Sequence, residues 1–158
     1  AESRRRLIPV LRLFLDANVL FVAGYSRISP VHDLLALGRV GACELVASGY
    51  AVEEARRNLE AKGPIGAVEA LGAAMADITP VAEARAPALE AAASAALTDP
   101  ADVPILAAAI QCRADILVTG DRRAFGRHFR MRLNGVEVLV LRDTLRRVLG
   151  MPLDDPPP

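Results

Sequence analysis

Hydrophobic residues along this chain fall into short continuous runs, separated by longer stretches with helical spacing. A continuous apolar run is typical of a strand that is buried on both faces. We expect strands at residues 11–15, 44–48, 115–119 and 136–141, and a short edge strand at residues 77–81. We expect helices at residues 19–23, 31–37, 52–61, 65–76, 88–97, 105–113 and 143–149, and a short helix or turn at residues 122–127. The alternation predicts an α/β fold with a mostly parallel sheet and helices on both faces.

The pattern predicts one domain at residues 10–150, with an N-terminal tail at residues 1–9 and a proline-rich C-terminal tail at residues 151–158. Apolar residues make up 53% of the 158 positions, which argues against global disorder. No apolar run approaches the roughly 20 residues that cross a bilayer. Cys43 and Cys112 lie in apolar surroundings, which suits buried, reduced thiols. We therefore expect a cytoplasmic protein that is not inserted in a membrane.

Two of the predicted strands run directly into an aspartate. Asp16 follows the apolar residues 13–15, and Asp121 follows the run at residues 116–120. Parallel strands gather their C-terminal ends at one edge of the sheet, where ligands bind. Two carboxylates at that edge repel each other unless something positive lies between them. The repeated pattern therefore points to a divalent cation.

Two further acidic residues are expected at the same edge, although each also has a purely structural interpretation. Asp102 opens a predicted helix, where an aspartate is more often an N-cap than a ligand, and Asp99 is the same case. Pro104 favours a helix start at Asp102, because a proline beyond the first turn clashes with the preceding turn. Glu53 and Glu54 follow the second strand on a helix. Consecutive helical residues point about 100° apart, so only one of them can face the site, and we favour Glu54.

Polar residues beside these acids either support them or serve local structure alone. Asn18 suits a turn, and the Thr119 hydroxyl points to the same side as Asp121, two positions later. The formal net charge is zero, which argues against an overall electrostatic attraction to nucleic acid. Arginine nonetheless supplies 18 of the 19 basic residues, and a cluster at residues 122–132 either contacts phosphate or forms a solvated loop. The candidates for phosphate contact are Arg122, Arg123 and Arg127.

Four segments of the chain resemble, in order, the sequence motifs of PIN-domain nucleases. They are residues 15–20, residues 53–59, residues 99–109 and residues 117–121. The similarity covers about residues 11 to 142. The resemblance implies a three-layer α/β/α sandwich and an endoribonuclease that depends on Mg²⁺ or Mn²⁺. Many members are toxins of type II toxin–antitoxin pairs and many form homodimers, so the resemblance also implies an RNA substrate and an antitoxin partner.

The resemblance assigns roles to individual residues of this chain. It makes the catalytic cluster Asp16, Glu54, Asp102 and Asp121. It implies that Asp16, Asp102 and Asp121 bind the metal ion, and it gives supporting roles to Asn18, Thr119 and Asp99. Relatives often carry a histidine three residues after the last aspartate, where this chain has Ala124. That departure leaves the acids intact and concerns the contact with substrate.

Two other classes of protein fit parts of the pattern. A signalling receiver domain also has a carboxylate pocket, but it pairs its acids with a lysine after a late strand, and the only lysine here is Lys62. A non-catalytic PIN-like module that binds RNA or a protein has no use for four carboxylates whose repulsion destabilises the fold. The expected function is therefore metal-dependent hydrolysis of RNA phosphodiester bonds.

Overall fold

The computed structural model describes residues 10–155, so the predicted tail at residues 1–9 and the last three residues of the chain lie outside the described part. Six strands form one sheet in the order β3-β2-β1-β4-β6-β5. Their bounds are Arg12–Leu15 for β1, Glu44–Ser48 for β2, Thr79–Val81 for β3, Ile116–Val118 for β4, Arg132–Leu133 for β5 and Val136–Leu139 for β6. All neighbouring pairs are parallel except β5 with β6. The predicted α/β class with a mostly parallel sheet is confirmed.

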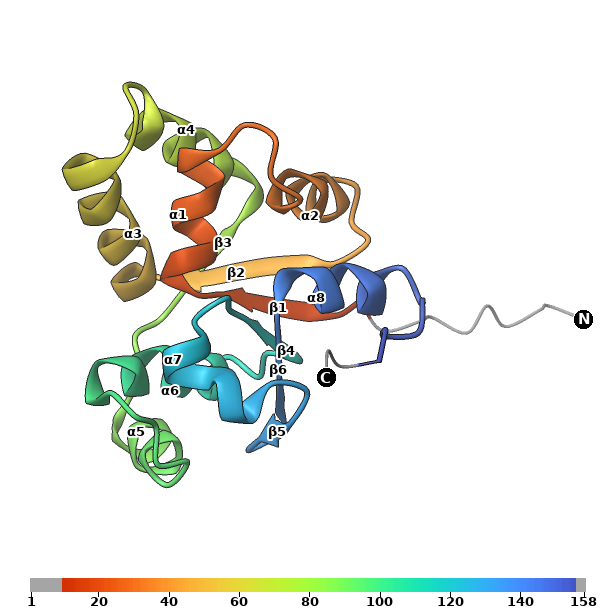
Figure 1. Ribbon diagram of the computed structural model, residues 1–158. Coiled ribbons are helices and arrows are strands. Elements are labelled where there is room, and N and C mark those ends of the chain that lie inside the picture. Colours follow the sequence, from red (N-terminus) through yellow and green to blue (C-terminus); the bar gives the residue numbers. More distant parts are fainter. Residues whose placement is uncertain (1–9, 156–158) are drawn as a thin grey trace, which may run out of the picture.

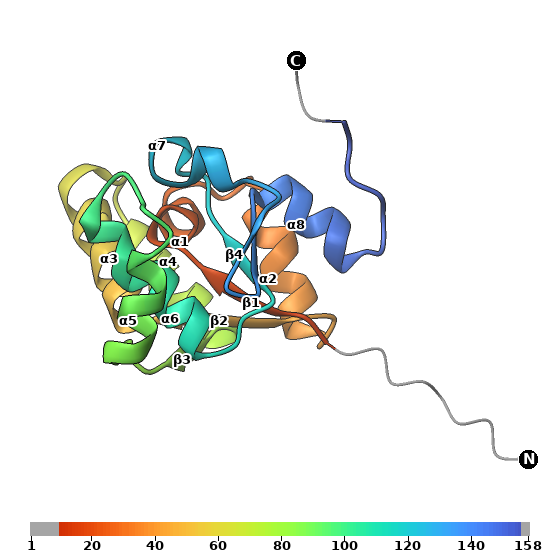
Figure 2. The same cartoon turned by 90° about the horizontal axis from the view of Figure 1, so that it is seen from below.

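Helices cover both faces of the sheet (Figure 1). One side carries α1 (Ala17–Tyr25), α2 (Val31–Arg39), α3 (Gly49–Lys62) and α4 (Ala67–Ala74). The other side carries α5 (Ala86–Ala93) and α6 (Val103–Gln111), and the short α7 (Arg122–Phe125) follows β4. The last helix, α8 (Leu141–Val148), lies beside α2 in both views (Figure 2). The expected three-layer α/β/α sandwich is confirmed.

Strand β1 lies in the interior of the sheet, and this position explains the apolar run at residues 13–15. Phe14 pairs with Val46 of β2 on one side and with Leu117 of β4 on the other. Leu13, Phe14 and Leu15 are all fully buried or nearly so. Because helices cover both faces, the three strand residues that follow Arg12 are all apolar, rather than every second one. The first polar residue after this run, Asp16, therefore marks the edge of the sheet.

Close packing of α1 fixes its position relative to α3 and α4. A Cβ atom on Gly24 would lie 2.6 Å from the Leu59 Cδ1 atom of α3 and 2.7 Å from the Ala67 carbonyl oxygen of α4. A real Cβ atom cannot approach other atoms so closely, so glycine permits this contact between the helices. The C-terminal ends of α1 and α3 are thereby held side by side, with the start of α4 packed against them.

Several predicted boundaries were wrong, and one strand was missed. The last strand ends at Leu139 rather than at residue 141, because α8 begins at Leu141. The helix expected at residues 88–97 is α5, which ends at Ala93. Strand β5 was not expected, because only two residues, 132–133, pair with β6. They are joined to β6 by Asn134 and Gly135, with φ angles of 48° and 86°, which form a tight hairpin turn.

Three short 3₁₀ segments complete the described chain: Met75–Asp77, Pro100–Asp102 and Gly126–His128. Within residues 10–155, no helix combines the length and the apolar character of a membrane span. Cys43 is buried and Cys112 is half-buried, and neither forms a disulfide. Burial raises the pKa of the Cys43 thiol to about 11, so this side chain stays protonated near neutral pH.

Candidate active site

Asp16 stands at the C-terminal end of β1 and caps α1. Its backbone N–H donates to the Val118 carbonyl oxygen at 3.0 Å, which continues the pairing of β1 with β4 by one residue. Its Oδ1 atom accepts from the Ala17 N–H at 2.7 Å. The side chain is nearly buried, with 4% exposure. The carboxylate is therefore held in a fixed position at the edge of the sheet.

Thr119 and Asn18 tie Asp16 to the end of β4. The buried Thr119 hydroxyl donates to the Asp16 Oδ2 atom at 2.8 Å. The Asn18 side-chain amide donates to the same Oδ2 atom and to the Thr119 Oγ1 atom, each at 3.2 Å. The Asn18 Oδ1 atom in turn accepts from the Gly120 N–H at 2.9 Å. Two of the three residues to which sequence analysis gave supporting roles, Asn18 and Thr119, therefore contact Asp16 directly.

Asp121 belongs to the same network from the β4 side. Its backbone N–H donates to the Thr119 Oγ1 atom at 3.1 Å. Its Oδ1 atom accepts from the Ala124 N–H at 3.0 Å, so Asp121 caps α7. One oxygen of this carboxylate is engaged in the cap, which leaves Oδ2 to face the cavity described below.

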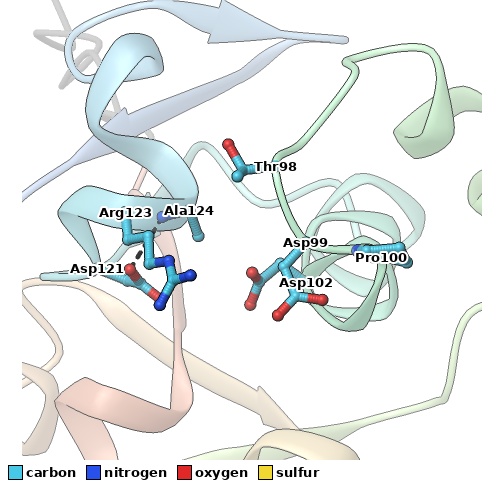
Figure 3. Close-up of a pocket in the computed structure, with 7 residues that line it drawn as sticks. All are labelled: Thr98, Asp99, Pro100, Asp102, Asp121, Arg123 and Ala124. Atoms are coloured by element: carbon cyan, nitrogen blue, oxygen red, sulfur yellow. Dashed lines mark hydrogen bonds between the residues drawn. The ribbon is translucent and has the colours of Figure 1, made fainter.

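Sequence analysis left open whether Asp99 and Asp102 act as helix caps or as ligands, and only Asp99 forms a capping hydrogen bond in the structure. The Asp99 carboxylate accepts from the Ala101 N–H at 2.9 Å and starts the 3₁₀ turn. Asp102 occupies the residue before α6, as predicted, but its side chain makes no capping hydrogen bond. Its carboxylate instead lines a cavity opposite Asp121 (Figure 3). Asp99 thus caps the turn and lines the same cavity as Asp102, whose carboxylate makes no capping hydrogen bond.

Glu53 and Glu54 are separated by the geometry of α3. Glu53 is exposed and pairs with Arg56, which also pairs with Glu60 further along the same helix. Glu54 is partly buried and lines the same cavity as Asp16, Asp102 and Asp121. The expectation that Glu54 is the inward-facing member agrees with this placement.

The acidic side chains surround a cavity of about 230 Å³ between α1, α3 and the start of α6. The pKa of Asp16 is raised to about 6, chiefly by burial and also by the charges of Glu54 and Asp121, while the hydrogen bonds from Thr119 and Ala17 oppose this rise. Burial also raises the pKa of Asp102 to about 6, followed by the charges of Asp16 and Asp121. The fold therefore holds carboxylates where their negative charges are unfavourable.

The donor set of this cavity fits a hard divalent cation. Carboxylate oxygens are the ligands that Mg²⁺ and Mn²⁺ prefer, and a cation would relieve the repulsion between these groups. Within residues 10–155, no three histidine, cysteine, aspartate or glutamate side chains already converge closely enough to enclose an ion. Asp16 is fixed by its hydrogen bonds, whereas Glu54 and Asp102 make no side-chain hydrogen bond to the described residues. The carboxylates of Glu54 and Asp102 therefore line the cavity beside Asp16 without being held by other side chains of residues 10–155.

Sequence analysis missed four other residues of this region. Phe21, Asn58 and Lys62 line the same cavity as Glu54. The signal was available, because residues 54, 58 and 62 recur at the four-residue spacing of one helix face. The Tyr50 hydroxyl donates to the Ala101 carbonyl oxygen at 3.2 Å, which links α3 to the turn before Asp102. Burial and the charges of Glu54 and Asp102 raise the pKa of Tyr50.

The three candidate arginines do not share one location. Arg123 lines a second cavity of about 380 Å³, and Figure 3 shows it beside Asp121 and across from Asp99 and Asp102. Arg122 lines a separate depression near α8, and Arg127 is exposed and lines neither of the acidic cavities. Only Arg123 therefore combines a positive charge with a place beside the carboxylates. Phosphate contact by any of the three stays a prediction.

Fold and site together define an α/β protein with an acidic cavity at the C-terminal edge of a mostly parallel sheet. The sequence matches the family model of the PIN domain over residues 12–123, and the chain therefore belongs to the PIN domain family. The fold is similar to a chain of the crystal structure of VapBC2 from Rickettsia felis bound to a DNA fragment from their promoter, with a TM-score of 0.62. The two are 14% identical over 82% of this chain and 98% of that chain. Comparison with curated proteins gives no match.

Proposed function

We propose that this protein is a metal-dependent endoribonuclease that hydrolyses RNA phosphodiester bonds. The observation that carries the proposal is the convergence of Asp16, Glu54, Asp102 and Asp121 on one cavity from four separate segments of the chain. Clustered carboxylates repel one another and lower the stability of a fold. A bound hard cation would offset this repulsion, and carboxylate oxygens are ligands that such a cation prefers. Membership of the PIN domain family supports the same reading.

The four acidic residues have two parts in the proposed reaction. Asp16, Asp102 and Asp121 would hold Mg²⁺ or Mn²⁺, and Glu54 would complete the shell or orient water. A bound divalent cation would lower the pKa of a coordinated water, which makes it a nucleophile near neutral pH, and would place positive charge beside the phosphate. Asn18 and Thr119 keep the Asp16 carboxylate in a single orientation through hydrogen bonds of 2.8 to 3.2 Å. Arg123, at the rim of the second cavity, is placed to hold a phosphate of the RNA backbone.

We further propose that the protein acts in the cytoplasm as the toxin of a toxin–antitoxin pair, and that it forms a homodimer. The family resemblance supports this, and so does the fold that it shares with a chain of the VapBC2 structure. The acidic cavity favours a partner segment that carries arginine, because opposite charges across an interface speed and direct association. Co-purification with the product of a neighbouring small gene, and the mass of the complex in solution, test these statements.

Cleavage of single-stranded RNA in the presence of Mg²⁺ or Mn²⁺ tests the proposed enzyme. We expect the full chain to cut RNA only with the cation, and Asp16→Asn to reduce the rate by about 100-fold or more, because a lost ligand forfeits several kcal/mol of transition-state stabilisation. Asp33→Asn is the matched control, since Asp33 is an exposed aspartate of α2 outside the acidic cavity. Equal activity of the wild type and Asp16→Asn would contradict the assignment. Binding of RNA without any cleavage would favour the non-catalytic alternative.

A further inference from the structure

The acidic cavity continues along the junction of α1 and α3, away from the carboxylates. On α3, the residues that line it are Glu54, Asn58 and Lys62, spaced one helical turn apart. Lys62 lies eight residues beyond Glu54, which is roughly 12 Å along the helix. On the facing helix, Phe21 lies beyond Asn18. The cavity therefore has an acidic end, an amide in the middle, and an end that joins an aromatic ring to a cation.

An aromatic pair and the only lysine of the chain meet at that second end. The rings of Phe21 and Tyr25 stack with centroids 5.3 Å apart and planes 23° from parallel. The Lys62 Nζ atom lies 5.4 Å from the centroid of the Phe21 ring. The sequence has four phenylalanines, two tyrosines and no tryptophan, and two of these six aromatic residues form this pair, with Phe21 half-buried and Tyr25 exposed. This arrangement is therefore not a by-product of an aromatic-rich core.

The exposure and charge of this group also differ from those of a packing cluster. Tyr25 is 51% exposed, so much of its ring faces solvent. Lys62 forms no ion pair with a carboxylate of residues 10–155, whereas Arg56 on the same helix pairs with both Glu53 and Glu60. The Lys62 ammonium is thus held over a ring and remains available to an external anion. An aromatic face beside an unpaired ammonium is what a nucleotide needs, because the base stacks and the phosphate binds the cation.

We propose that the junction of α1 and α3, lined by Phe21, Tyr25 and Lys62, is a subsite for an unpaired nucleotide of the RNA substrate, adjacent to the bond that is cut. The inference rests on the proposed function, and it adds a binding site for one nucleotide of that substrate. The base lies against the Phe21–Tyr25 pair, and a phosphate next to it contacts Lys62. A base in a duplex has its faces covered by its neighbours, so the subsite accepts a nucleotide that is not stacked in a helix.

Quenching of a fluorescent base provides the test. The probe is a short single-stranded RNA that carries 2-aminopurine, titrated without divalent cation into the full chain with Asp102→Asn, so that the RNA is not cut during the measurement. In this background we expect Tyr25→Ala and Lys62→Ala to weaken binding by about fivefold or more, the effect of losing one stacked base or one phosphate contact. Tyr25→Phe and Lys62→Arg keep the ring and the charge, and we expect them to bind like the parent.

Two controls separate this subsite from general charge and from the proposed enzyme. Arg113→Ala removes one positive charge at an exposed residue before β4, at the opposite edge of the sheet, and should leave binding unchanged. A duplex with the same sequence should not quench. Unchanged affinity in Tyr25→Ala and Lys62→Ala, equal quenching by the duplex, or no binding at all would overturn the subsite. RNA cleavage by the wild type is scored separately, so the enzyme can stand while the subsite fails.

Discussion

At the scale of single residues, Asp16 is where folding and the proposed chemistry conflict most. It is almost completely buried, and burial raises its pKa to about 6. Three donors nevertheless point at its oxygens: the Ala17 N–H, the Thr119 hydroxyl and the Asn18 amide. These hydrogen bonds favour the charged form and oppose the effect of burial. The carboxylate is thus kept both oriented and ionisable near neutral pH.

Thr119→Val tests this balance at one atom. The substitution keeps the shape and removes the hydroxyl that lowers the pKa of Asp16, so that pKa should rise further. It also leaves the Asp121 N–H without its acceptor. We expect RNA cleavage to fall by roughly 10-fold or more, as for other supporting partners of metal ligands, and its pH profile to shift to higher pH. Thr119→Ser retains the hydroxyl and should behave like the wild type, and an unshifted profile in Thr119→Val would contradict the role of this hydroxyl.

At the scale of elements, the site is assembled from the ends of helices as much as from strands. Asp16 caps α1, Asp121 caps α7, and Asp102 precedes α6. Backbone N–H groups at these helix starts partly offset the negative charges that gather there. The α3 helix differs, because Glu54 lies in its body and reaches the cavity from its side.

Adjacent glutamates on α3 allow a comparison in which only the face of the helix changes. Glu54→Gln removes a carboxylate from the cavity, and we expect RNA cleavage to fall about tenfold or more. Glu53→Gln breaks only an exposed pair with Arg56, which solvent screens, and should leave cleavage unchanged. Melting temperatures measured alongside the rates show that neither effect comes from unfolding. Equal losses in both variants would contradict the placement of Glu54.

Helix faces were harder to read from the sequence than strand ends. The aspartates after β1 and β4 were found because buried strands are continuous apolar runs that end sharply. Phe21, Asn58 and Lys62 were missed because one residue in a helix pattern shows its face only when its neighbours at four-residue spacing are considered together. Sequence analysis considered Lys62 only as the lysine of a receiver domain. In the structure, α3 places Lys62 at the same cavity as Glu54.

At the scale of the whole molecule, the alternation of strands and helices predicted a mostly parallel sheet covered on both faces, but it predicted neither the strand order nor the shortest strand. Strand β5 has only two residues, so no hydrophobic period can reveal it. The Asn134-Gly135 turn was the available signal, because that pair of residues favours the positive φ angles of a tight hairpin. The separate roles of Asp99 and Asp102 also required the structure, since both precede α6 and both suit a cap.

The raised pKa values of Asp16 and Asp102 predict how stability depends on pH without divalent cation. Both pKa values rise from 3.8 to about 6 on folding, so the native state binds more protons than the unfolded state between these values. Their contribution to stability is therefore fully present below about pH 4 and is lost as the pH rises through 6. For Asp16 the loss is on the order of 3 kcal/mol. Urea unfolding in a chelator across pH 4 to 7 measures it.

Two comparisons isolate these groups from the rest of the molecule. Asp102→Asn should reduce the fall in stability between pH 4 and 7, because an amide does not titrate. The carboxylates of Asp77 and Glu53, whose pKa values are lowered by Arg39 and Arg56, are present in both proteins and do not contribute to this difference. Added Mg²⁺ or Mn²⁺ should raise the melting temperature more at pH 7 than at pH 4, since the ionised carboxylates bind the cation. A cation effect that does not grow with pH would contradict the assignment of these acids.

The hydrogen bond from Thr119 to Asp16 joins residues 103 positions apart, and this distance has a consequence during synthesis. The ribosome joins Asp16 well before Asp102, Thr119 and Asp121, which follow much later along the chain. Until β4 pairs with β1, the nascent chain holds Asp16 without the partners that orient it. If the chain is the proposed ribonuclease, we expect products truncated before residue 121 to cleave no RNA, which a cleavage assay on such truncated chains would measure.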